Sequence, residues 1–161
     1  MSIHLHLRAV TESEIRDDHT WLVAFMLAAW ESHPDEYAAG IADSIDKIFH
    51  SVDDLYAAAG VLRADADEPW TLPVYGGRPV AHGADDDPSE PPLMILEPSD
   101  VARAAAFLAA VSFDDLWGEA GAKLDTWEDA RQEFLHHHED LRDFYGRAAS
   151  AGHAVVKVVW A

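Results

Sequence analysis

The chain has 161 residues, a formal net charge of −19, 49% hydrophobic residues and no cysteine. This length fits one domain, and the apolar content excludes a disordered chain. The negative charge disfavours nucleic acids and anionic membranes as partners, since phosphate binding requires clustered Lys and Arg. The lack of cysteine excludes disulfides, thiolate metal sites and cysteine nucleophiles. A solvated acidic surface explains the charge without any partner; a basic protein or a cation is what the charge would attract.

The N-terminal part predicts a strand and then a helix. Ile3–Val10 alternates apolar and polar residues, which is typical of a strand with one buried face. Thr11 and Glu14 have the spacing of a capping box, so a helix is expected over about Glu12–Glu31. Its second half is apolar all round, which indicates burial on several sides. Ser32–Asp35 contains a proline and ends it.

The stretch Ile41–Gly60 is the one around which we expect the rest of the chain to be organised. Apolar residues recur there at three- and four-residue steps, which predicts an amphipathic helix. Gly60 stands where a left-handed cap would end that helix. The apolar stripe consists of Ile41, Ile45, Ile48, Phe49, Val52, Leu55, Tyr56 and Ala59.

A long irregular loop is expected next, at about residues 61–92. It contains most of the prolines and an acidic tract, Asp85–Asp87, and we expect at most a short strand around Leu72–Tyr75. A connection of this length is usually either functional or mobile. The acidic tract lacks the later Glu of a calcium loop and is expected to be a solvated loop tip.

The C-terminal part predicts helices and a closing strand. Helices are expected from Pro98, from Ser112 to near Gly121, and over about Thr126–Ala151. His153–Trp160 is β-branched and reads as a strand, for which the N-terminal strand is the obvious partner. The prediction is an α+β fold: a mostly helical single domain, residues 1–161, with a small sheet that pairs the two terminal strands.

The order of several short motifs resembles the YfbM-like family, small bacterial proteins treated as a domain of unknown function. An N-terminal strand precedes Asp46-Lys47-Ile48-Phe49-His50, and Gly76-Gly77 follows. Pro98-Ser99-Asp100-Val101 then opens a helix, and Leu141–Val155 closes the chain with Leu-x-x-Phe-Tyr-x-x-Ala-Ala-x-x-Gly-x-Ala-Val. The resemblance spans nearly the whole chain and implies a cytoplasmic bacterial α+β domain. It implies no activity.

The candidate pocket consists of Asp46, Lys47, His50, Gly76 and Gly77. On a helix, Asp46 and His50 would lie one turn apart, and an Asp that orients a His is half of a general acid–base arrangement. Lys47 could bind an anionic group. The structural alternative is that Asp46 and Lys47 hold the turn at Gly76-Gly77. No serine lies in a nucleophile elbow and no phosphate-binding glycine pattern is present, so no catalytic group is assigned.

Two histidine groups could be metal ligands, but simpler explanations are preferred. Adjacent residues of His136–His138 point about 100° apart on a helix, so they cannot share an ion as i, i+4 pairs do. His4 and His6 share one face of the first strand, with His153 near its partner, but a polar strand face explains them equally well. We therefore predict no metal and no cofactor.

These observations favour a non-enzymatic, cytoplasmic protein-binding domain, monomer or homodimer, whose partner is a basic protein. An immunity-type role, in which the acidic surface masks a basic toxin, is one concrete version. The alternative is a small-molecule binder or enzyme with its pocket between the helix 41–60 and the Gly76-Gly77 loop. No signal-peptide pattern is present, so export is not expected. The apolar run Trp21–Trp30 has ten residues, about half of what a membrane-spanning helix needs.

Overall fold

In the computed structural model, which describes residues 2–63, 67–83, 87 and 89–161, five strands form one antiparallel sheet in the order β2-β1-β5-β4-β3. The strands are β1 (His4–Val10), β2 (Ala42–Ile45), β3 (Arg78–Val80), β4 (Leu93–Leu96) and β5 (Ala154–Trp160). The α-helices are α1 (His19–Glu31), α2 (His33–Ala38), α3 (Phe49–Ala57), α4 (Ala59–Leu62), α5 (Pro98–Ala110), α6 (Phe113–Leu124) and α7 (Ala130–Ser150). The predicted α+β fold with paired terminal strands is confirmed, since β1 and β5 pair along their whole length.

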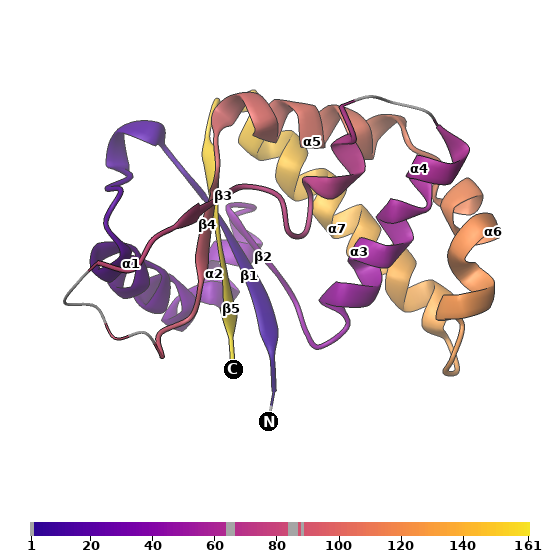
Figure 1. Ribbon diagram of the computed structural model, residues 1–161, viewed down its shortest axis with the longest axis horizontal. Helices are drawn as coiled ribbons and strands as arrows, with labels where there is room; N and C mark the ends of the chain where they lie inside the picture. Colours follow the sequence, from indigo (N-terminus) through magenta and orange to yellow (C-terminus); the bar gives the residue numbers. More distant parts are fainter. Residues whose placement is uncertain (1, 64–66, 84–86, 88) are drawn as a thin grey trace.

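Helices cover both faces of the sheet, which is seen nearly edge-on at the centre of Figure 1. α1 lies on one side, and α3, α5, α6 and α7 lie on the other. The strand sequences explain this arrangement, because alternate residues of β1 and β5 enter different cores. Leu7 and Val155 belong to the core under α3, α5, α6 and α7, whereas Val10 and Val156 belong to the core under α1.

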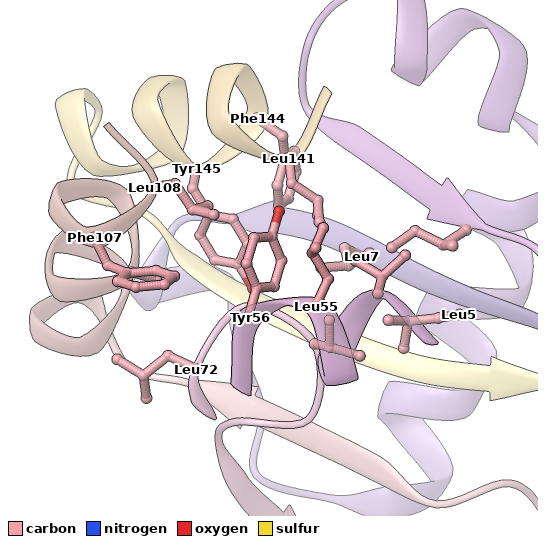
Figure 2. Packing of buried hydrophobic residues seen from close by; sticks show 14 of the residues in the cluster. Leu5, Leu7, Leu55, Tyr56, Leu72, Phe107, Leu108, Leu141, Phe144 and Tyr145 are labelled. Carbon is pink, nitrogen blue, oxygen red and sulfur yellow. The ribbon is translucent and has the colours of Figure 1, made fainter. Parts of the chain in front are cut away.

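The larger core brings aromatic side chains from three helices onto the sheet. Figure 2 shows Tyr56 of α3 between Phe107 of α5 and Leu7 of β1, with Tyr145 of α7 close by. Tyr56 and Phe107 meet edge to face with ring centroids 5.8 Å apart, a favoured geometry for aromatic pairs. All four side chains are buried. This core fixes α7 and α3 relative to the sheet.

The predicted helix over Glu12–Glu31 is wrong in its first third. Only a short 3₁₀ turn, Glu12–Glu14, forms there, and the side chain of Thr11 makes no cap hydrogen bond. The real N-cap is Asp18, whose carboxylate accepts from the backbone N–H of Trp21 at 3.0 Å. The helix is also less buried than its composition suggested, because Leu27 is half exposed.

The predicted helix over Ile41–Gly60 is wrong at both ends. Its beginning is strand β2, which pairs with β1, and the helix α3 starts only at Phe49. Four residues are about one helical turn but also two strand repeats, so the spacing of Ile41 and Ile45 fits both structures. The edge of β1 offers backbone hydrogen-bond partners, and residues 42–45 therefore form a strand. Gly60 lies inside the short helix α4 rather than at a cap.

The stretch 61–92 contains more regular structure than expected. Leu72–Tyr75 forms turns, not a strand, and the strand β3 begins at Arg78. β3 lies at the edge of the sheet, where its Pro79 can be tolerated because the outer side of an edge strand needs no N–H donor. Asp85 and Asp86 of the predicted acidic tract lie outside the described residues.

The C-terminal predictions are confirmed with small shifts at the boundaries. α5 begins at Pro98 and α6 at Phe113, after Ser112, whose hydroxyl accepts from the backbone N–H of Asp115 at 3.2 Å. α6 continues past Gly121 to Leu124. α7 begins at Ala130 and runs unbroken through the three histidines.

Candidate functional site

A polar groove lies at the β2 edge of the sheet, between α2 and α7. In the register of the sheet, Asp43 of β2 stands opposite Leu7, and Ser44 stands opposite His6. Consecutive residues of a strand point to opposite faces, so Asp43 and Ser44 face different sides of the sheet edge. Asp43 lies beside Asp140 of α7, and Ser44 contacts His33 of α2. The edge strand thus supplies polar groups to both sides of one groove.

Asp43 is a buried carboxyl group with an incomplete set of partners. Its side chain is only 2% exposed, and its Oδ1 accepts from the backbone N–H of Ser44 at 2.8 Å. Its Oδ2 is buried without a hydrogen-bond partner among the described residues. Burial, with the nearby charge of Asp140, raises the pKa of Asp43 to about 7. An unpaired buried carboxyl group is costly, so it suggests a site rather than a structural contact.

Asp140 connects α7 to α2. The Tyr37 hydroxyl donates to its Oδ2 at 2.8 Å, and this hydrogen bond, with burial, raises the pKa of Tyr37 to about 12. His136 Nε2 lies 3.4 Å from the same oxygen. One Asp140 oxygen is therefore shared by two neighbours from different elements, which places the carboxylate firmly at the groove wall.

Histidine and tryptophan side chains close the α2 side of the groove. His33 Nε2 lies 3.0 Å from the Ser44 hydroxyl, and its Nδ1 is buried without a partner among the described residues. Burial lowers the pKa of His33, so the ring is neutral at neutral pH. His6 meets the rings of His33 and Trp30 at centroid distances of 5.4 and 4.9 Å. The polar face of β1 is thus covered by α1 and α2 rather than solvated.

Two small cavities open along this groove and share three residues, Tyr37, Asp43 and Asp140. One, of about 220 Å³, is also lined by Asp143 and Arg147. The other, of about 240 Å³, is completed by His33, Pro34, Ser44, His136 and His137, without any Lys or Arg. Both are smaller than typical drug-sized pockets of roughly 300–1,000 Å³ and suit the tip of one side chain. A larger surface hollow between α5 and α7, of about 780 Å³, is lined by Arg142, Asp143 and Arg147.

Asp46, Glu133 and His137 form the one arrangement suited to a metal ion among the described residues. Each offers one ligand atom, and these atoms all lie within 4.8 Å of one another. Glu133 and His137 are one turn apart on α7, and Asp46 reaches them from the turn between β2 and α3. Burial and the neighbouring His136 lower the pKa of His137, although Asp46 and Glu133 act in the opposite direction.

The structure separates the predicted pocket residues into two places. Asp46 lies near α7, and its backbone carbonyl accepts from the Phe49 N–H at 3.0 Å. His50, on the first turn of α3, lies 3.4 Å from the Tyr75 hydroxyl, beside Gly76-Gly77, and 3.8 Å from Asp54. Lys47 is exposed. None of Asp46, Lys47, His50, Gly76 and Gly77 lines the cavities described above.

The turn that carries Gly76 is held by a buried lysine that the sequence analysis missed. Lys157 of β5 is fully buried, and its Nζ donates to the carbonyls of Leu72 and Gly76 at 2.6 and 2.9 Å. The Tyr145 hydroxyl donates to the Pro73 carbonyl at 2.7 Å. A Cβ at Gly76 would lie 2.4 Å from the Leu72 Cα, so only glycine fits. Lys157 is the one charged residue in the apolar run Val155–Val159, and this position could have indicated a buried lysine with polar partners.

The remaining histidines do not form a metal cluster in the described part of the chain. His138 is buried, and its Nδ1 lies 3.0 Å from the Tyr56 hydroxyl. Burial lowers the pKa of His138 to about 4. His6 Nδ1 accepts from the Trp160 indole at 3.2 Å, so it has a structural partner.

Comparison with known proteins places the whole chain in relation to one family. A family model described as "Domain of unknown function (DUF1877)" matches residues 1–158. The crystal structure of YfbM from Escherichia coli, described as a protein of unknown function, is similar, with a TM-score of 0.54 and 14% identity. The similarity covers 98% of this chain and 99% of that one, and at this identity it shows the fold alone. No curated protein matches the chain. Within the described residues, no helix has both the length and the apolar character that crossing a membrane requires.

Proposed function

We propose that this chain, which belongs to the DUF1877 family of domains of unknown function, is a cytoplasmic, non-enzymatic binding domain for a basic protein partner. A lysine or arginine side chain of that partner enters the groove between β2 and α7. The observation that carries the proposal is Asp43, which lines both cavities and whose buried Oδ2 has no hydrogen-bond partner in the described part of the chain. The masking of a basic toxin is one concrete version of this function.

The chemistry of the groove favours a cationic guest. An ammonium or guanidinium group would donate to Asp43 Oδ2 and would face Asp140 across the same cavity. The 240 Å³ cavity offers no Lys or Arg that would repel such a group. The net charge of −19 would also steer a basic protein toward this surface and accelerate association.

A peptide of alternating glycine and lysine, acetylated and amidated, tests this proposal. We expect calorimetry to detect binding to the wild-type protein, and we expect Asp43→Asn to weaken it by about tenfold, which corresponds to ~1.4 kcal/mol. The matched control is Glu139→Gln, which removes one exposed carboxylate from the same helix as Asp140 but away from the cavities. Equal weakening in both variants would show diffuse attraction to an acidic surface and would contradict an anchor at Asp43.

A second candidate function is favoured by the contact between His50 and Tyr75. This contact brings His50 close to the Gly76-Gly77 turn, which supports one part of a small-molecule pocket built from Asp46, Lys47, His50, Gly76 and Gly77. The support is narrower than for the groove, because the His50 side chain is 71% exposed.

His50→Ala tests the second candidate. Because His50 is mostly exposed, we expect the melting temperature to change by less than about 3 °C. If the pocket exists, native mass spectrometry of untagged wild-type protein shows a small added mass that His50→Ala lacks. A clear drop in melting temperature without any lost mass would instead identify His50 as structural.

A further inference from the structure

Three residues from two segments far apart in the chain come together at the end of the groove. Asp46 lies in the turn after β2, and Glu133 and His137 lie on successive turns of α7. Their ligand atoms lie within 4.8 Å of one another, a spacing at which one ion can contact all three. No sequence pattern indicates this cluster, because only the packing of α7 against β2 creates it.

Contacts outside the cluster hold the Glu133 side chain and the turn that carries Asp46. The indole N–H of Trp127 donates to Glu133 Oε2 at 2.9 Å and leaves the other carboxylate oxygen for a ligand. The turn at Asp46 is closed by the Phe49 N–H. In the part of the chain described, no Lys or Arg forms an ion pair with Asp46 or Glu133. Two carboxylates therefore meet without a cationic partner.

An independent feature beside the cluster also indicates a polar guest. His137 lines the 240 Å³ cavity as well, and that cavity contains Asp43, 2% exposed, with its unpartnered Oδ2. The imidazole of His137 thus stands between the carboxylate cluster and a cavity whose lining includes Asp43 and His33, each with one buried atom that lacks a partner among the described residues. Asp46 is exposed, and Glu133 and His137 are half-buried, so coordination positions remain for water or a ligand.

We propose that Asp46, Glu133 and His137 bind one divalent transition-metal ion. Imidazole nitrogen with two carboxylate oxygens is a donor set suited to Zn²⁺ or Mn²⁺, whereas Ca²⁺ and Mg²⁺ prefer oxygen ligands throughout. The ion's double charge balances the two carboxylates. Three protein ligands leave the ion with an open position, as in sites that hold water or a further ligand.

Calorimetric titration of chelator-treated, untagged protein with Zn²⁺, and separately with Mn²⁺, tests the site. We expect one ion per chain, and a loss of affinity of about 100-fold or more in His137→Ala and in Asp46→Asn. His136→Ala is the matched control, because it removes the neighbouring imidazole of the same helix, which contacts Asp140 instead. Circular dichroism verifies that each variant is folded.

The outcomes separate this proposal from the binding of a basic partner. Unchanged affinity in His136→Ala and in Asp43→Asn, with loss in His137→Ala and Asp46→Asn, supports a metal site that is distinct from the cationic anchor. Equal losses in His136→Ala and His137→Ala would show adventitious binding to surface histidines and would overturn the proposal. Absence of binding by the wild-type protein to both ions would overturn it as well, without affecting the peptide experiment.

Discussion

Asp43→Asn is expected to stabilise the protein by roughly 2–4 kcal/mol at pH 8 and to change its stability little near pH 4. Burial raises the pKa of Asp43 from 3.8 to about 7, so the folded protein keeps a proton that the unfolded chain releases between these values. The unfolded state binds fewer protons in this window, and stability therefore falls as the pH rises from 4 to 7. Above pH 7 the folded protein carries a buried charge at full cost. Asparagine removes this cost and keeps the oxygen that accepts from the Ser44 N–H.

Urea unfolding of the wild type and of Asp43→Asn at pH 5 and pH 8 measures this effect. The quantity to compare is the difference in free energy of unfolding between the two proteins at each pH. Burial lowers the pKa values of His6 and His138 to about 3 and 4, which makes the stability of both proteins rise with pH up to about 6.5. This background cancels in the difference. Asp143→Asn, a more exposed carboxylate of the same groove, is the control and should change stability by less than about 0.5 kcal/mol. A destabilised Asp43→Asn at pH 8 would mean that the ionised carboxyl group has a partner.

The combination of stability and binding in this variant is informative. If Asp43→Asn is more stable and also loses affinity for the basic peptide, the buried carboxyl group is retained for binding at a cost in stability, as is common at functional sites. If the variant gains stability and keeps its affinity, the groove is not the anchor, and the charge of −19 serves solubility.

The sequence predicts the terminal strands and the later helices well, because their periodicity agrees with their final environment. β1 and β5 have strand patterns, and each finds in the other the partner that a mostly apolar strand requires. β4 was missed, since Leu93–Leu96 is a short apolar run that directly follows prolines. Such a run has no period of its own, and only its pairing with β5 makes it a strand.

The groove could be predicted only in fragments. Asp46 was chosen because it would lie one helical turn from His50. The chain instead passes from strand β2 into a turn at Asp46, so the two residues do not share a helix. Asp43 lies within the stretch for which the sequence predicts a helix, and it belongs to no motif. Its burial follows from the strand register, which turns it toward α7, and no local pattern encodes that packing. His138 was missed for the same reason, because the stripe of α7 is wider than its apolar residues indicate.

The second large effect is expected at Lys157, the buried lysine that holds the turn before β3. Lys157→Met keeps the apolar stem and removes the donor to the carbonyls of Leu72 and Gly76. A buried carbonyl without a partner costs about 1–3 kcal/mol, so we expect a loss of roughly 2–4 kcal/mol in the free energy of unfolding near pH 10, where the cost of keeping the buried amine deprotonated is small. Lys123→Met, at an exposed position of α6, is the control and should change little.

The pH dependence of the same difference tests whether burial lowers the pKa of Lys157. Burial lowers the pKa of Lys157 from 10.5 to about 7, so between these values the unfolded chain holds a proton that the folded protein has released. Because of this amine, the free energy of unfolding of the wild type rises by up to about 1.4 kcal/mol per pH unit above pH 7. Lys157→Met has no such amine and lacks this increase. We expect the difference in urea unfolding between wild type and Lys157→Met to be larger at pH 9 than at pH 7. A difference that stays constant between these two values would show that the amine titrates alike in both states. Lys157 would then donate to the two carbonyls as a charged ammonium group.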